Sequence, residues 1–232
     1  NTSLEYLKGE FKNSYSDENA INYSIFTTKI NPEYIATIRN FNIKIGVKVY
    51  LSLDTENDAT NILLYPDLLV KKPIIKEYLN VYAGFSGDLH TNTYKSFTEE
   101  NPFVSPTLFI TQTSEKSNIF LGFNGKLTND ISFNLKASIK DEEDKPLFLR
   151  NNSKSDGTSA IVNGTTLKGY EFGNSFSVYY DDVKTTSFLA ELEYDFTKKI
   201  SFNTQIQYHK YTLTNALESF NLPTLQAAFT GT

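Results

Sequence analysis

The sequence predicts an all-β fold in which antiparallel strands form a transmembrane β-barrel. Three observations support this prediction. Apolar and polar residues alternate with a period of two in many segments, helical periodicity is scarce, and very short connections alternate with long polar ones. The chain has 232 residues, and we expect it to supply about ten strands of a larger barrel.

The clearest hairpin lies at residues 119–139. Odd-numbered residues on both sides of residues 128–130 are mostly apolar, and even-numbered residues are mostly polar. This pattern predicts two antiparallel strands joined by a short turn. Phe120 is an exception, because it is an aromatic residue on the polar face.

The same alternation defines the other expected strands. Apolar residues occupy the odd positions of residues 41–53 and the even positions of residues 188–196. The spacing of the connections requires residues 174–196 to form one long strand. We expect strands at roughly residues 3–15, 20–30, 37–53, 61–70, 75–89, 117–127, 131–140, 174–196, 200–214 and from 224 onward.

The connections between these strands fall into two classes of length. If short and long connections alternate strictly, all short turns lie at one end of the sheet and all long loops at the other. This asymmetry is typical of outer-membrane barrels, which have short periplasmic turns and longer extracellular loops. We expect short turns at residues 71–73, 128–130 and 197–199, and long loops at residues 90–116, 141–173 and 215–223.

The apolar face is predicted to contact lipid. The polar faces are rich in Asn, Gln, Ser, Lys and Glu, which suits a water-filled lumen, and the apolar band at residues 188–196 is close to the ~9 to 11 residues of a tilted transmembrane strand. Aromatic residues flank the turn at 197–199, as an interfacial girdle would. The residues expected to face lipid are Ile119, Leu121, Phe123, Ile131, Phe133, Leu135, Phe188, Leu192, Tyr194, Phe196, Phe202 and Ile206. The residues expected to face the lumen are Asn124, Lys126, Asn134, Lys136, Glu191, Glu193, Gln205 and Gln207.

The composition argues against several classes of protein. The net charge of -5 offers no basic stripe for a nucleic acid. The chain has no Cys, so it has neither a disulfide framework nor a thiolate metal site. No window approaches the ~18 to 20 continuous apolar residues of a transmembrane helix.

No residue pattern indicates an enzyme. His90 and His209 are far apart in the sequence and have no Ser- or Cys-based motif nearby. The acidic runs at residues 54–58 and 141–144 are interpreted as solvated loops, and the first lacks the glycine and the distal Glu of a calcium-binding EF-hand loop. We therefore predict no catalytic residue, no cofactor and no metal site.

Two further groups of side chains have a structural interpretation. Glu191, Glu193 and Asp195 alternate along one face, where we expect them to line the lumen. The loop aromatic residues could contact a ligand or pack the loops, and packing is expected. The lysines available to these carboxylates are Lys126, Lys136 and Lys140, and the loop aromatics are Phe97, Phe103, Phe109 and Phe220.

Three segments resemble parts of TonB-dependent receptor-like outer-membrane proteins of Gram-negative bacteria. They are ENPFVSPTL at residues 100–108, YEFGNSFSVYYDDV at 170–183 and FNLP at 220–223. The resemblance implies a barrel of about 22 strands filled by a plug domain, which imports scarce ligands with energy from an inner-membrane partner. No plug-like segment is visible, so we expect residues 1–232 to be part of a single barrel domain.

The leading functional hypothesis is a receptor-like barrel of the bacterial outer membrane that imports a ligand not identified by the sequence. Its expected partners are outer-membrane lipid and either a TonB-type energising partner or other envelope proteins. A second hypothesis is a structural barrel subunit of an outer-membrane assembly or secretion complex. A third is a secreted, soluble β-sandwich that binds glycans, which the absence of Trp and the loop asymmetry disfavour.

Overall fold

The strands of this protein form one large antiparallel sheet. The computed structural model describes all residues except 16–18, 57, 77, 155–160, 163–164, 167–170, 172, 198 and 217. In the described part, one short helix and a separate two-stranded ribbon accompany the sheet. The elements are β1 (Thr2–Phe11), β2 (Ile21–Ile30), β3 (Glu33–Ile38), β4 (Phe41–Asp54), β5 (Ala59–Ile75), β6 (Leu79–Thr91), α1 (Tyr94–Glu100), β7 (Gln112–Lys126), β8 (Ile131–Arg150), β9 (Ile161–Val162), β10 (Thr165–Thr166), β11 (Phe176–Thr197), β12 (Ile200–Leu213) and β13 (Leu225–Gly231).

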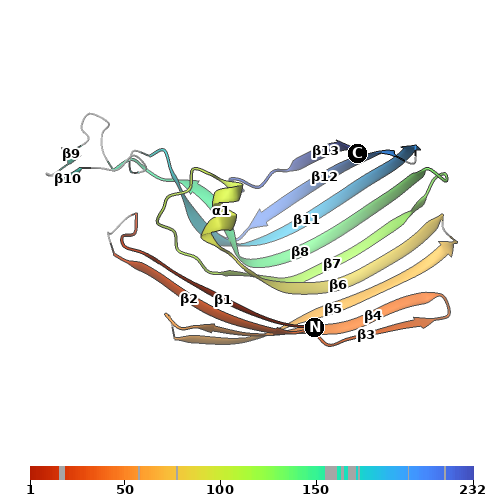
Figure 1. The fold of residues 1–232 in the computed structure, drawn as a ribbon, viewed down its shortest axis with the longest axis horizontal. Helices are drawn as coiled ribbons and strands as arrows, with labels where there is room; N and C mark the ends of the chain where they lie inside the picture. Colours follow the sequence, from red (N-terminus) through yellow and green to blue (C-terminus); the bar gives the residue numbers. More distant parts are fainter. Residues whose placement is uncertain are drawn as a thin grey trace.

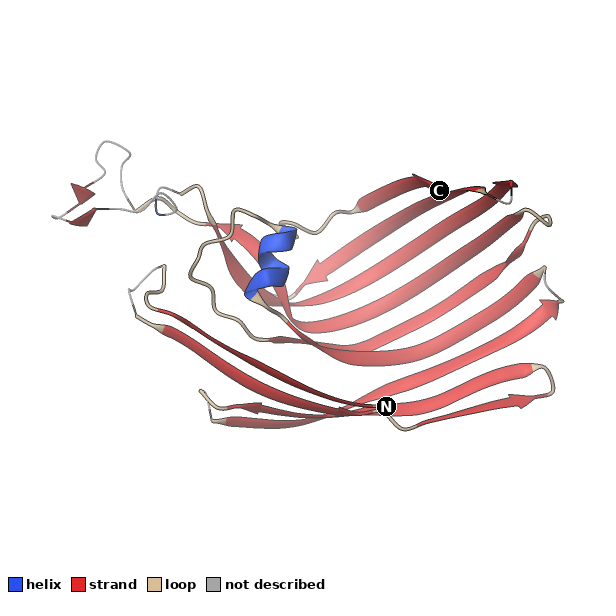
Figure 2. Ribbon diagram, viewed as in Figure 1, coloured by secondary structure: helices blue, strands red, loops and turns tan. Residues whose placement is uncertain are grey.

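The sheet has eleven strands in the order β1-β2-β4-β5-β6-β7-β8-β11-β12-β13, with β3 paired to β4. Neighbouring strands along this order are antiparallel, and the sheet curves without closing on itself (Figures 1 and 2). This confirms the predicted antiparallel all-β barrel architecture. Helix α1 has 7 residues, and no helix in the described part of the chain is long and apolar enough to cross a membrane.

The connections alternate between the two ends of the sheet as predicted, but the short β4–β5 connection, between Asp54 and Ala59, lies at the end expected to carry only long loops. The turns β3–β4, β5–β6, β7–β8 and β11–β12 lie at one end of the sheet, and α1 and the longer loops lie at the other (Figure 1). In the β3–β4 turn, Arg39 and Asn40 have positive φ angles of 46° and 65°. Two consecutive positive φ values are typical of the two-residue hairpin turn whose twist matches that of the strands.

The predicted turn at residues 71–73 is wrong. Strand β5 continues to Ile75, and Lys71 pairs with both Asn42 on β4 and Tyr82 on β6. The register shifts between Pro73 and Ile75, and such an irregularity near a strand end accommodates a residue without an N–H group. The turn therefore follows Ile75, closer to the start of β6.

The predicted strand at 37–53 is also wrong, because the β3–β4 turn at Arg39–Asn40 lies within it. A second irregularity lies between β2 and β3. Strands β2 and β3 both pair with β4, β2 along Val49–Asp54 and β3 along Phe41–Gly46. They form one interrupted line of strand, broken at Asn31 and Pro32. Proline cannot donate to a ladder, which explains the break at this position.

Several strands extend beyond the alternating segments. The predicted strands 117–127 and 131–140 correspond to β7 and β8. Strand β7 begins earlier, at Gln112, and strand β8 continues to Arg150. The acidic run at 141–144 thus lies within β8 and not in a loop. The prediction of one long strand at 174–196 is confirmed by β11.

The sheet curves towards its polar face. Lys29 on β2 approaches Asp88 on β6 to 3.3 Å, although β4 and β5 lie between these strands in the sheet. Gln112 on β7 likewise donates to Thr27 on β2 at 2.8 Å. Side chains so distant in strand order meet only where the sheet bends towards them, so the polar face is concave and the apolar face is convex.

Candidate functional site

The concave face carries networks of polar side chains, and Asp88 is the centre of one of them. Its carboxylate accepts hydrogen bonds from Lys48 Nζ at 2.7 Å, from Lys29 Nζ at 3.3 Å and from the hydroxyl of Tyr50. Lys48 Nζ also donates to the backbone oxygen of Gly87 at 2.9 Å. Charge-assisted bonds of this kind are stronger than neutral ones, so Asp88 ties β2 and β4 to β6.

A second network surrounds Glu142, whose side chain is 6% exposed. Lys145 Nζ lies 2.7 Å from one of its oxygens and Lys140 Nζ lies 3.1 Å from the other. Lys140 also approaches Glu115 at 3.7 Å, and Glu115 lies 3.8 Å from His90 Nε2. A buried carboxylate needs such cations, because removing a charge from water costs several kcal/mol unless it is paired.

A third network supports the interruption between β2 and β3. Asp67 on β5 is buried, and Lys44 Nζ lies 2.7 Å from its Oδ1. Asn31 Nδ2 donates to the other oxygen of Asp67 at 3.4 Å. The break in the strand line is therefore held against β4 and β5 by polar contacts.

The fourth network lies closer to the short turns. Asn134 Nδ2 donates to Glu191 Oε2 at 2.6 Å, and Gln205 Nε2 donates to Glu191 Oε1 at 3.2 Å. The hydroxyl of Tyr82 donates to Asn134 Oδ1 at 2.6 Å, so the chain of bonds crosses β6, β8, β11 and β12. The strand register places all predicted lumen residues on this concave face, namely Asn124, Lys126, Asn134, Lys136, Glu191, Glu193, Gln205 and Gln207.

The expected lysine partners of Glu191 and Glu193 are wrong. Glu193 accepts from Ser132 Oγ at 3.3 Å, and Glu191 is bonded to amide side chains as described. Among the described contacts, Lys136 instead lies over an aromatic ring and Lys140 is paired with glutamates. Amide and hydroxyl donors stand directly opposite these carboxylates in the ladder. Lys136 and Lys140 are in other rows, and Lys126 is in the row of Glu193 but two strands away, beyond Ser132.

Phe120 has a specific place on the polar face. A Cβ atom added at Gly84, its cross-strand partner, would collide with the Phe120 ring, so the ring covers this glycine. Lys136 Nζ lies 4.5 Å from the centre of the same ring. Tyr82 covers Gly122 in the same way. Aromatic side chains over strand glycines pin the register of a curved sheet.

The convex face presents the residues predicted to face lipid. Exposed fractions of the side chains reach 58% at Ile119, 54% at Phe188 and 48% at Ile206. Ile131, Phe133 and Phe202 are half-buried by their neighbours on the same face. Their contact with lipid stays a prediction, which the exposure of this face supports. The register places on this face Ile119, Leu121, Phe123, Ile131, Phe133, Leu135, Phe188, Leu192, Tyr194, Phe202 and Ile206. Phe196 lies at the irregularity between Asp195 and Thr197, and its ring centre is 6.0 Å from that of Tyr194.

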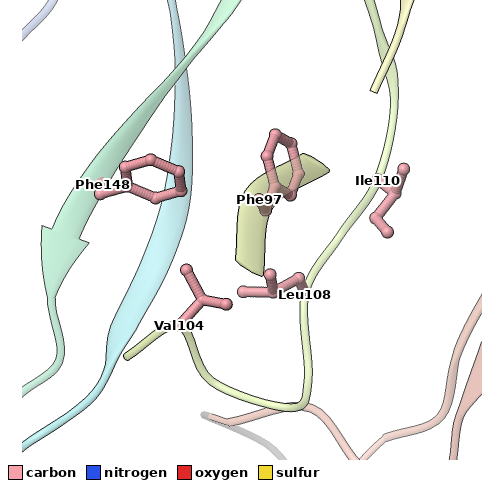
Figure 3. Close-up of a cluster of buried hydrophobic side chains, with 5 residues drawn as sticks. All are labelled: Phe97, Val104, Leu108, Ile110 and Phe148. Carbon is pink, nitrogen blue, oxygen red and sulfur yellow. The ribbon is translucent and has the colours of Figure 1, made fainter. Parts of the chain in front are cut away.

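The β6–β7 connection packs into an apolar cluster at the loop end. Helix α1 begins after Thr93, whose Oγ1 accepts from the Ser96 N–H at 3.0 Å. Phe97 on this helix is 2% exposed and makes an edge-to-face contact with Phe148 on β8, with ring centres 5.9 Å apart. Figure 3 shows this cluster, which consists of Phe97, Val104, Leu108, Ile110 and Phe148.

The same cluster joins opposite parts of the sheet. Side chains of β1 and β2 pack against it from one side, and Val178 and Tyr180 of β11 pack against it from the other. The hydroxyl of Tyr180 donates to the backbone oxygen of Phe109 at 3.0 Å. Packing is therefore the role of Phe97, whereas the other loop aromatics are exposed. These exposed residues are Phe103, Phe109 and Phe220.

The acidic and histidine residues form no metal centre in the described part of the chain, where no group of three His, Cys, Asp or Glu side chains could hold an ion. His209 lies on the concave face, and its Nδ1 is 2.7 Å from Ser187 Oγ. In the run at 54–58, Asp54 Oδ1 accepts from the Glu56 N–H at 3.1 Å and stabilises a tight connection, and residue 57 lies outside the described residues.

Sequence reasoning missed Asp88, Asp67 and Glu142 as centres of networks. Asp88 and Asp67 lie within predicted strands. Lys29 approaches Asp88 from a strand that is not its neighbour, so this contact depends on curvature, whereas Lys44 approaches Asp67 from the adjacent strand β4, whose register with β5 was not predicted. The only available signal was a charged residue at a concave-face position, and this does not identify its partner.

The fold is similar to that of solved outer-membrane structures. The structure of the copper transporter OprC matches with a TM-score of 0.56 and 12% identity over 92% of this chain and 33% of that chain. The pyoverdine outer membrane receptor FpvA from Pseudomonas aeruginosa PAO1, bound to pyoverdine, matches with a TM-score of 0.56 and 11% identity over 93% of this chain and 29% of that chain. These proteins are TonB-dependent outer-membrane receptors. The chain has the fold of a segment of a TonB-dependent receptor barrel.

This segment spans about a third of the length of the structures that it matches. No family model matches the sequence, and no curated protein matches it. Of the similar structures, OprC is a transporter and FpvA is a receptor.

Proposed function

We propose that this chain is part of the wall of an outer-membrane barrel that imports a ligand in the manner of a TonB-dependent receptor. The observation that carries the proposal is the separation of the two faces. The convex face is apolar and exposed, whereas the concave face carries networks of charged and amide side chains between the short turns and the apolar cluster at the loop end. A barrel wall needs this division, because lipid lies outside and water or a polar domain lies inside.

The height of the apolar face supports insertion in a bilayer. On β11, Lys184 and Tyr194 lie on the convex face ten residues apart, and the positions between them on that face are Thr186, Phe188, Ala190 and Leu192. Ten residues span about 33 Å of strand, or about 23 Å of height at a tilt of about 45°, which agrees with an apolar band about 25 Å tall. Tyr194 and Phe202 then belong to the aromatic girdle at the short-turn end.

This geometry also supports an orientation. The short turns belong in the periplasm and the loop end, with α1, belongs outside the cell, as in bacterial barrels. Outer-membrane lipid is the partner of the convex face, and a TonB-type protein supplies energy to the whole receptor. A soluble β-sandwich is disfavoured, because the described residues contain no second large sheet that could cover the convex face.

Two measurements on the full-length protein test the proposal. The protein is expected in the outer-membrane fraction, and as a folded barrel it should migrate faster on unheated than on heated denaturing gels. Recovery as a folded monomer without detergent would contradict the barrel. For import, cells producing the protein are supplied with copper ions or ferric pyoverdine. Uptake is expected to stop when the proton gradient is collapsed, and uptake that persists would contradict energised import.

A further inference from the structure

The connection between β6 and β7 folds into the space on the concave side of the sheet. We call this connection, residues 92–111 with α1, the strap. It packs against β1 and β2 on one side and against β8 and β11 on the other (Figure 1). Four of the five buried residues of the loop-end cluster belong to it (Figure 3). The strap thus supplies most of the apolar core at this end of the sheet.

Main-chain hydrogen bonds fasten the strap to β11. The N–H of Ser105 donates to the backbone oxygen of Phe176 at 2.7 Å, and the N–H of Phe176 donates to the backbone oxygen of Phe103 at 3.0 Å. Val104, between the two strap residues, forms a parallel bridge with Phe176 and is buried. Because buried backbone groups need partners, opening the strap on this side would leave several of them unpaired.

Side chains fasten the strap to the opposite wall. The ring of Tyr94 on α1 lies 5.6 Å from that of Phe11 at the end of β1. Just before the strap, Thr91 Oγ1 donates to Glu5 Oε2 on β1 at 3.0 Å. Six strands of the main order lie between β1 and β11. The strap therefore joins two distant parts of the wall across the concave side.

We propose that the strap is a fixed part of the receptor, which stays closed across this side of the barrel mouth rather than opening as a lid. The inference rests on the proposed function, because it requires the loop end to face outside the cell. Segments that open are drawn from regions with few buried apolar contacts, whereas the strap carries a buried cluster and is fastened on both sides. A ligand then passes beside the strap, which holds β1 and β11 at a fixed separation.

Cysteine labelling on intact cells that produce the full-length protein tests this proposal. Leu108 is 1% exposed and the adjacent Phe109 is 49% exposed, so Leu108→Cys and Phe109→Cys form a matched pair. The reagent is a maleimide that does not cross membranes, and the protein without an introduced cysteine gives the background. Residue 108 should react on the order of a hundredfold more slowly than residue 109, because it reacts only when the strap opens. If Leu108→Cys does not fold, as judged by gel mobility before and after heating, Ile110→Cys at another buried position takes its place.

Loss of either attachment should loosen the strap. Combined with Leu108→Cys, the substitutions Phe11→Ala and Tyr180→Ala should each raise the labelling rate of residue 108 on the order of tenfold, whereas Phe103→Ala, at an exposed side chain, should not. Equal labelling of residues 108 and 109 would overturn the proposal, as would an unchanged rate in either wall variant. Failure of the proposed function gives a different result, because residue 109 would then react only after the cells are lysed.

Discussion

A lysine at position 206 tests the assignment of the two faces most directly. Ile206 lies on the convex face opposite Ala190, close to the middle of the band between Lys184 and Tyr194. Its side chain is 48% exposed, so the substitution creates little steric conflict and its cost reports mainly on the surroundings. A lysine near the midplane of a transmembrane barrel costs about 2–4 kcal/mol. Ile206→Lys is therefore expected to lower the free energy of unfolding by this amount.

Gln207→Lys is the matched control, because Gln207 is the adjacent residue and points to the concave face. A lysine there stays on the concave face, between Leu189 of β11 and Gln226 of β13, and the expected change is below about 1 kcal/mol. The measurement is denaturant unfolding of the full-length protein in lipid vesicles, with the free energy obtained by linear extrapolation. Equal costs for the two variants, or a larger cost for Gln207→Lys, would refute the assignment of the faces.

Three further substitutions test depth, pairing and loop packing. Phe133→Lys, one residue pair closer to the short turns, should cost about 2 kcal/mol in the same unfolding assay, and a cost well above that at the midplane would contradict the placement in the bilayer. Glu142→Gln should lower the free energy of unfolding by about 3 kcal/mol, because two lysines lose their buried partner. The neighbouring Glu143→Gln removes an exposed ion pair and should lower it by less than about 1 kcal/mol. The reverse order would show that the network around residue 142 is not buried. Phe97→Ala removes the aromatic ring from the loop cluster and should increase protease cleavage within residues 92–111 at least severalfold, while Phe103→Ala, at an exposed side chain, should leave it unchanged.

The alternating segments show how much of the fold is local. The hairpin at residues 119–139 and the long strand β11 were predictable, because one face of each is apolar and the other is polar. The parts of β7 and β8 at the loop end of the sheet were not predictable in this way. Polar residues occupy both faces there, as in the acidic run at 141–144, so the period-two signal disappears although the ladder continues.

The turn expected at residues 71–73 illustrates a different limit. A Lys-Lys-Pro sequence is a reasonable turn signal, but the ladder with β4 and β6 continues through Lys71, and the irregularity at Pro73 accommodates the missing donor. The free energy gained when Lys71 pairs with two neighbouring strands outweighs the local preference of Lys-Lys-Pro for a turn. This pairing involves residues far away in the sequence, so no local pattern predicts it.

By itself the sequence determined which residues share a face, because side-chain direction in a strand depends only on position along that strand. It also determined that consecutive connections lie at alternate ends of the sheet, with the long loops at one end. Only the tertiary structure decided which polar residues meet. The contacts of Lys29 with Asp88 and of Phe97 with Phe148 depend on the curvature of the sheet and on the folding of a loop against it. Curvature accumulates over many strand pairs, so it cannot be derived from the alternation within any one strand.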